Sequence, residues 1–268
     1  NIHGHRETPR HMVRRHNPCR RLLASARHAE GLIGVSMIGR ARQLWFQTDS
    51  SQPTRLVQTE VIMEEGKVML QRSLRQTPYL NFMAHQLFQE QARRVLVPGV
   101  GGGLLPQALS AAGQQVVAVE HSSVVLSLAR KWMGLAEAEE LFAENLEILQ
   151  AEAEDFVATS ARSKPLFDAC VIDLFHGHTS SVPSSIRSLE FLENLKKLLR
   201  PSALVLHNAI DATNDSFHLY GAGGANNIRR QRWRSGDSAN VIRCTAKVRH
   251  AAPKGPLRPV TYLRQNED

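Results

Sequence analysis

The sequence RVLVPGVGGG, residues 94–103, decides the fold: it joins a valine-rich apolar run to four glycines within five residues. The run Arg94–Pro98 has the composition of a buried β-strand, and residues 104–112 follow with a helical pattern. Glycines between a strand and a helix let the backbone turn sharply and approach a ligand, where the helix N-terminus presents free N–H groups. An ordinary tight turn has the same composition, so the loop alone does not predict a ligand site and needs support from neighbouring residues.

Strand and helix patterns alternate on the carboxyl side of this loop, and one helical stripe precedes it. We expect strands at residues 94–98, 115–119, 168–172 and 203–206, helices at 79–91, 104–112, 122–132 and 188–199, and a last strand at 239–246. This alternation predicts an α/β fold, a Rossmann-like parallel sheet with helices on both faces. Short β-type runs at 32–38, 44–47, 55–63 and 67–71, with a hairpin turn at 65–67, predict a small antiparallel β unit before it.

The chain of 268 residues is long enough to bury a sizeable core, and its 42% hydrophobic and 22% charged residues are typical of globular proteins. We divide it into a basic disordered arm (1–30), a small N-terminal β unit (31–75), a Rossmann-like donor-binding and catalytic domain (76–248) and a basic tail (249–268). The net charge of +8 lies in the two ends, whereas residues 31–227 carry a net charge of −4. A mildly acidic body does not favour nucleic acid as a partner.

Several other classes of protein receive no support. No apolar run approaches the roughly 20 residues that cross a bilayer, so we expect a soluble protein without a membrane partner, cytoplasmic or organellar. The basic N-terminal arm has the composition of a disordered segment or the remnant of a targeting leader, and the chain begins with Asn1. Three cysteines far apart predict neither a disulfide framework nor a zinc site, and we expect no metal.

Acidic residues follow successive strands of the expected sheet. Glu120 ends the strand after the glycine loop, about 20 residues from its first glycine, where an acid accepts hydrogen bonds from ribose hydroxyls. Glu152 and Asp173 follow the next two apolar runs, and His176 and His178 lie just beyond. A single acid of this kind is commonly a loop charge or helix cap, but ligands bind at the carboxyl ends of parallel strands, so the series predicts a site there.

Residues 79–208 resemble the spermidine synthase family within the class I S-adenosylmethionine-dependent methyltransferases. The likeness is carried by Tyr79-Leu80-Asn81-Phe82-Met83-Ala84-His85, by the segment 94–103, by Val117-Ala118-Val119-Glu120, by residues 151–156, by residues 167–173 and by the strand closing on Asn208. It implies that Gly99, Gly101 and Gly103 pass beneath an S-adenosylmethionine or decarboxylated S-adenosylmethionine donor, that Glu120 holds its ribose and that Glu152 recognises its adenine. Asp173 would face the reacting centre and Tyr79 the acceptor.

Two departures from that family concern the aminopropyl chain of the donor and the polycationic acceptor. Polyamine aminopropyltransferases carry an Asp where this chain has Gly102, and a second acid where it has His176. Methyl transfer to a small-molecule or protein amine, or to a hydroxyl, is therefore our first interpretation, with Asp173 taking the proton directly or through His176. A polyamine aminopropyltransferase with an altered acceptor pocket, and a catalytically inactive binding or scaffold domain, remain open. A homodimer is compatible with either transferase.

Overall fold

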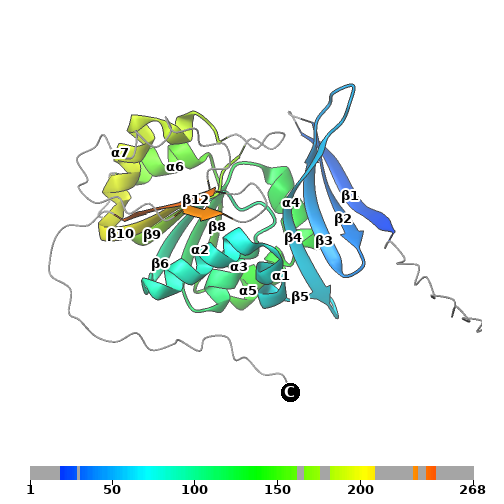
Figure 1. The fold of residues 1–268 in the computed structure, drawn as a ribbon, viewed down its shortest axis with the longest axis horizontal. Coiled ribbons are helices and arrows are strands. Elements are labelled where there is room, and N and C mark those ends of the chain that lie inside the picture. The colour runs from blue at the N-terminus through cyan, green and yellow to red at the C-terminus, as the bar shows by residue number, and fades with distance from the viewer. Residues whose placement is uncertain are drawn as a thin grey trace, which may run out of the picture.

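The computed structural model describes residues 19–28, 31–161, 166–175, 182–208, 232–234 and 240–245. A seven-stranded sheet runs through its centre in the order β11-β12-β10-β9-β6-β7-β8 (Figure 1). In chain order the strands are β6 (Arg94–Pro98), β7 (Gln115–Glu120), β8 (Leu146–Gln150), β9 (Phe167–Ile172), β10 (Leu199–Asn208), β11 (Arg232–Arg234) and β12 (Asn240–Thr245). The five strands from β10 to β8 are parallel, whereas β12 pairs antiparallel with β10 and β11 antiparallel with β12.

The order of these strands reverses beside β6. The chain proceeds outward from β6 to β7 and β8, and then returns to lay β9 along the other edge of β6. The connections after β6 and β9 therefore leave the sheet in opposite directions, which opens a crevice at the carboxyl ends of these two strands. The glycine loop follows β6 and Asp173 follows β9, so the topology places both at this crevice.

Helices cover both faces of the parallel sheet (Figure 1). They are α2 (Pro78–Gln89), α3 (Leu104–Ala111), α4 (Ser123–Trp132), α5 (Leu135–Leu141), α6 (Ala153–Ser160) and α7 (Leu189–Leu198). Alternate side chains of β6 divide between two hydrophobic cores: Val95 and Val97 pack with α2 to α5, and Leu96 packs with α6 and α7. This two-sided burial explains why the strands are continuously apolar. The fold class predicted from the sequence is confirmed.

An antiparallel sheet precedes this domain. Its strands pair in the order β1 (Arg20–His28), β2 (Gly31–Ile38), β3 (Ala41–Gln47), β4 (Arg55–Glu64) and β5 (Lys67–Val68). Glu65 and Gly66 both have positive φ, 49° and 85°, as the expected hairpin turn between β4 and β5 requires. The strand expected at 67–71 is shorter than predicted, because the helix α1 (Leu70–Gln76) already begins at Leu70.

The first strand corrects the predicted N-terminal boundary. Residues 20–28, assigned to a disordered arm, form β1 and pair with β2 along its length, from Arg20 opposite Ile38 to His28 opposite Gly31. A register shift between Leu22 and Ala24 breaks the alternation of apolar residues, so the strand has no clear period-two pattern in the sequence. Residues 1–18 of the predicted arm and the tail 249–268 lie outside the described residues.

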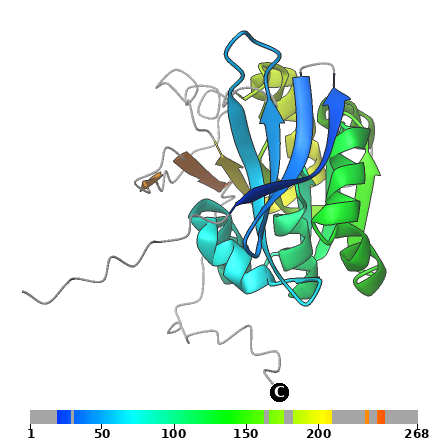
Figure 2. The ribbon, with the colours of Figure 1, turned by 90° about the vertical axis from the view of Figure 1, so that its right-hand side faces the viewer.

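The antiparallel sheet packs against the parallel domain through α1, α3 and α4 (Figures 1 and 2). Ile33, Leu44 and Val61 belong to the same hydrophobic core as α3 and α4. Arg42 on β3 donates a 2.7 Å hydrogen bond to the carbonyl of Trp132, the last residue of α4, where a cation also meets the negative end of the helix dipole. Within the described part of the chain, no helix is long and apolar enough to cross a membrane.

Candidate active site

The glycine loop turns away from β6 in a backbone conformation that side chains disfavour. Gly99, Gly101 and Gly103 all have positive φ, and Gly103 is the N-cap of α3. A Cβ on Gly99 would lie 2.7 Å from the carbonyl oxygen of Asp173, so the loop passes directly against the end of β9. Glycine at this position is required both by the φ of +88° and by this close approach.

Glu120 lies behind the loop and holds it in place. Its side chain is buried, with the residue only 6% exposed. One carboxylate oxygen, Oε2, accepts hydrogen bonds from the backbone N–H groups of Val100 and Gly101, both at 3.2 Å. The other, Oε1, accepts one from the N–H of Ser122 at 3.0 Å and lies 3.2 Å from Nδ1 of His121. The carboxylate therefore joins the end of β7 to the turn after β6.

The charge on Glu120 is maintained by these contacts. Burial alone would raise the pKa of the carboxyl group, but the hydrogen bonds from His121, Ser122 and Gly101 outweigh it and lower the pKa below its usual value. Four contacts also use the lone-pair positions that a carboxylate offers. Ribose hydroxyls that bind Glu120 would have to replace or share one of them, and the exposed His121 is the contact most easily displaced.

Backbone hydrogen bonds bring the ends of neighbouring strands to one edge. The N–H of Gly99 donates to the carbonyl of Val119, and the N–H of Ala151 donates to that of Glu120, so the pairing continues past the strands. Glu152 follows directly as the N-cap of α6, with its side chain exposed and making no capping hydrogen bond. The structure thus places Glu120 and Glu152 at successive strand ends on the same side of the glycine loop. Their roles toward a donor remain predictions.

Asp173 lies across the crevice from Glu120 and is held from two sides. Its Oδ2 accepts a long hydrogen bond of 3.4 Å from the hydroxyl of Tyr79 in the first turn of α2. Its Oδ1 accepts a 2.9 Å hydrogen bond from Nδ2 of Asn208 at the end of β10. Burial raises the pKa of Asp173 even though both hydrogen bonds act to lower it. Burial and the nearby Asp173 carboxylate raise the pKa of Tyr79 well above its usual value, so Tyr79 stays protonated at neutral pH.

A second aspartate, Asp168 near the start of β9, has a structural role and serves as a comparison. Asp168 accepts hydrogen bonds from the backbone N–H groups of Arg93 and Arg94 and forms a 2.6 Å ion pair with Arg200. Although burial acts to raise its pKa, these partners lower it. Asp168 is therefore committed to joining β6, β9 and β10, whereas Asp173 at the opposite end of β9 has a raised pKa and faces a cavity.

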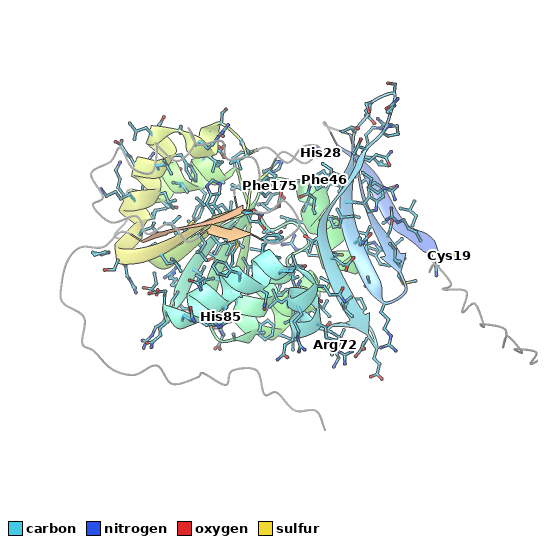
Figure 3. All side chains as sticks on the ribbon, in the orientation of Figure 1. Cys19, His28, Phe46, Arg72, His85 and Phe175 are labelled. Atoms are coloured by element: carbon cyan, nitrogen blue, oxygen red, sulfur yellow. The ribbon has the colours of Figure 1, made fainter. Side chains whose placement is uncertain are left out.

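That cavity has a volume of about 280 Å³ and lies between the two sheets. Its walls come from β4, the start of α2, the glycine loop, the start of α3 and the ends of β9 and β10. Phe175 lines it just beyond β9, on the side toward the antiparallel sheet (Figure 3).

The cavity gathers some of the predicted site residues and not others. Tyr79, Gly99, Gly101 and Asp173 line it together. Three further predicted residues are not among its lining residues, namely Gly103, Glu120 and Glu152. His176 and His178 lie outside the described residues.

Strand β4 supplies polar groups that the sequence analysis missed. Its register with β3 shifts at Gln58, because Leu44 pairs with Thr59 while the next residue, Trp45, pairs with Val57. Gln58 is thus the extra residue of a β-bulge, and bulges redirect side chains relative to the regular alternation. Five consecutive residues of β4, 56 to 60, line the cavity, and the bulge lies within this run.

Thr59 makes a direct contact with the glycine loop. Its Oγ1 accepts a 2.9 Å hydrogen bond from the N–H of Gly102. A Cβ on Gly102 would lie 2.7 Å from both Cβ and Cγ2 of Thr59, so the space beside this glycine is filled by β4. An acid at position 102, as in polyamine aminopropyltransferases, would therefore require Thr59 to move.

Asn208 is another residue of the cavity whose side chain the sequence analysis did not assign. It directly ends a parallel strand, as Glu120 does, and a polar residue at that position could have been predicted as a site residue. Thr59 and Gln58 carried no such signal, because they reach the site from a separate sheet. In the part of the chain that the structure describes, no group of three or more His, Cys, Asp or Glu side chains is arranged to hold a metal ion.

Comparisons with known proteins agree with this architecture. No family model matches the chain. A polyamine aminopropyltransferase of Vibrio vulnificus is 24% identical over 139 residues, which are 51% of this chain and 44% of that relative, so the match spans less than half of the relative's length. The spermidine synthase of Thermotoga maritima superposes with a TM-score of 0.53 at 14% identity, over 85% of this chain and 74% of its own.

Two further structures share the fold. A spermidine synthase in complex with the transition-state analogue AdoDATO gives a TM-score of 0.54 at 16% identity, over 85% of this chain and 75% of its own. Human methyltransferase-like protein 13 in complex with SAH gives 0.53 at 18% identity, over 66% of this chain and 84% of its own. The chain is thus a distant homologue of a polyamine aminopropyltransferase and has the fold that spermidine synthases share with S-adenosylmethionine-dependent methyltransferases.

Proposed function

We propose that this protein is a transferase that uses an S-adenosylmethionine-type sulfonium donor and transfers a methyl group to an amine or hydroxyl acceptor. The observation that carries the proposal is the arrangement at the switch point of the sheet. A glycine loop backed by the buried Glu120 faces, across one crevice, the carboxylate of Asp173 with its raised pKa. Two structures of the same fold were determined in complex with SAH and with the transition-state analogue AdoDATO.

The residues present fit a nucleoside donor at the glycine loop. The closely packed turn at Gly99 leaves no room for a side chain between loop and β9, and Glu120 would accept hydrogen bonds from ribose hydroxyls in place of its contact with His121. Glu152, exposed at the next strand end, would recognise the adenine amino group. When bound, a sulfonium donor supplies an activated carbon and its own leaving group.

Asp173 would take the proton that the acceptor loses. A general base works best when its pKa approaches the working pH, and burial moves the pKa of Asp173 in that direction. Tyr79 remains a hydrogen-bond donor and orients the carboxylate from α2. The cavity beside Asp173 would receive the acceptor, between β4 and α2.

Aminopropyl transfer to a polyamine is the second candidate, because Glu60 on β4 lines the same cavity as Asp173. Two carboxylates would help to balance a polycationic acceptor, whose buried charges need partners. Thr59 argues against it, because it fills the space beside Gly102 in which the aminopropyltransferases place an acid.

Isothermal titration with S-adenosylmethionine, its decarboxylated form and 5′-methylthioadenosine tests the proposal. A methyltransferase should bind S-adenosylmethionine more tightly than the decarboxylated form, and an aminopropyltransferase should show the reverse. Binding of 5′-methylthioadenosine reports the nucleoside half of the site alone. If none of the three binds, the chain is not a sulfonium-dependent transferase, and the scaffold interpretation takes its place.

A further inference from the structure

Asn208 lies beside Asp173 at the edge of the candidate active site. It is the last residue of β10, and His207 before it pairs with Ile172, the last residue of the neighbouring strand β9. The parallel register therefore sets Asn208 next to Asp173 at the carboxyl edge of the sheet. Its side chain is buried, with the residue 1% exposed, and it lines the cavity.

The two ends of the Asn208 amide have different surroundings. Nδ2 donates the 2.9 Å hydrogen bond to Oδ1 of Asp173. Oδ1 is buried and has no hydrogen-bond partner among the residues that the structure describes. The direction of the amide follows from its neighbour, because a carboxylate accepts from the NH₂ group and would repel the amide oxygen. A buried acceptor without a donor is costly, and a ligand that donates a hydrogen bond to it would remove that cost.

We propose that Asn208 binds the attacking group of the acceptor through Oδ1 and positions Asp173 through Nδ2. This inference rests on the proposed function. An attacking amine nitrogen that carries two hydrogens would donate one hydrogen bond to Oδ1 of Asn208 and another to the carboxylate of Asp173. Its lone pair then forms the new N–C bond while the S–C bond breaks, the sulfur leaves with the bonding pair as a neutral thioether, and Asp173 keeps the proton.

A hydroxyl acceptor has only one hydrogen and gives it to Asp173, so it leaves Oδ1 of Asn208 unpaired. Asn208 should therefore favour amine over hydroxyl acceptors, because a site built to hydrogen-bond a group discriminates against an analogue that lacks it. Matched probes are 1,4-diaminobutane and 1,4-butanediol, each assayed with S-adenosylmethionine and with its decarboxylated form.

Asn208→Leu preserves approximate volume and removes both hydrogen bonds. We expect it to lower kcat/KM for the diamine by about tenfold or more, while the dissociation constant of the donor changes less than about twofold. Asn194→Leu on α7, whose side chain bonds to Lys197 and does not line the cavity, is the matched control and should leave both unchanged. An equal rate for the diamine in Asn208→Leu and the natural protein would overturn the acceptor contact.

A readout that needs no activity tests the positioning role. Asn208 donates a hydrogen bond that lowers the pKa of Asp173, so Asn208→Leu should raise that pKa. Carbon-13 NMR of labelled aspartate carboxyl groups measures it, with the Asp173 signal assigned from its loss in Asp173→Asn. Tyr79 on α2 and Glu60 on β4 also line this cavity, and His207 precedes Asn208 on β10. Because Tyr79, Glu60 and His207 are present in both the natural protein and Asn208→Leu, a difference in the pKa of Asp173 between the two reports the loss of Asn208.

Asn208→Asp separates the two roles. It keeps an acceptor oxygen but replaces the donor with a second carboxylate beside Asp173, which should raise the pKa of the pair. The acid limb of the pH–rate profile should then move to higher pH. An Asp173 pKa that is the same in the natural protein and in both variants would refute the positioning role. Failure of the natural protein to bind any donor would refute the proposed function instead, because the carboxyl titration does not depend on it.

Discussion

Glu120→Gln is the sharpest test of the donor site, because this substitution keeps the shape of the side chain and removes its charge. The carboxylate accepts from Val100 and Gly101 on one oxygen and contacts Ser122 and His121 with the other. Glutamine has only one acceptor oxygen. Its NH₂ group must then point either at Val100 and Gly101 or at Ser122 and His121. Each pair contains a backbone N–H donor, so hydrogen bonds to one of the two pairs are lost.

The magnitude follows from the number of bonds affected. Hydrogen bonds to a charged group contribute about 1.5–3 kcal/mol each, so weakening two should cost about 3 kcal/mol of the free energy of unfolding. For a chain of this size that corresponds to a decrease of about 6–12 °C in Tm. Loss of the ribose contacts should weaken donor binding by roughly 2–3 kcal/mol, which is about 30- to 150-fold in Kd.

The assay must separate ribose contacts from damage to the loop. We would titrate the natural protein and Glu120→Gln with 5′-methylthioadenosine and with its 2′-deoxy analogue, and treat the four affinities as a double-mutant cycle. The natural protein should prefer the ribose compound, and the variant should have lost most of that preference. If the folded variant kept the full preference, Glu120 would not hold the ribose, and its role would be to fix the glycine loop.

The same substitution also tests how stability depends on pH. The pKa of Glu120 is lower in the folded protein than the usual value for glutamate. The carboxylate therefore contributes stability that is fully present above the usual value and is lost as the pH falls through the lowered one. Urea unfolding of the natural protein should show a decrease in the free energy of unfolding at acidic pH. In Glu120→Gln, the share of this decrease that comes from protonation of Glu120 should be absent.

The other predictions concern the base, the loop and β4. Asp173→Asn should lower the rate constant for transfer by roughly 10²- to 10⁴-fold with little change in donor affinity, measured by single-turnover assays; an unchanged rate would make Asp173 structural. Thr59→Val should weaken donor binding by about 1 kcal/mol in titrations, and Thr59→Ser should not, because serine can still accept from Gly102. Gly99→Ala should cost at least about 2 kcal/mol in denaturant unfolding, whereas Gly66→Ala, with similar φ but open space, should cost about 1–2 kcal/mol; equal costs would contradict the close approach to β9.

The parallel domain was predictable because its signals are local. The strand at 94–98 matches β6 residue for residue, and helices expected at 104–112, 122–132 and 188–199 match α3, α4 and α7 within two residues at either end. Continuous apolar runs identify strands buried on both faces, and the serines at 122 and 188 cap the helices that follow them. Glu120, the last residue of β7, and Asp173, which follows β9, could be found for the same reason, from their position at a strand end.

The parts that were missed depend on contacts between segments distant in the sequence. Strand β1 has no clear alternation, and its place is set by pairing with β2. Thr59 reaches Gly102 across 43 positions of sequence, and Asn208 reaches Asp173 across 35. Nothing in the residues around Thr59 indicates a site, because the bulge at Gln58 is visible only in the register with β3.

The antiparallel sheet is therefore part of the candidate site and not merely attached to it. Its strand β4 forms one wall of the cavity, and Thr59 accepts a hydrogen bond from the same glycine loop that Glu120 holds. Its strand β1 also reaches the neighbourhood of Glu120, where the ring of His28 packs edge-on against that of His121 with 6.1 Å between the ring centroids. Since the loop is hydrogen-bonded both to Glu120 of the parallel domain and to Thr59 of β4, its conformation depends on both sheets being folded together.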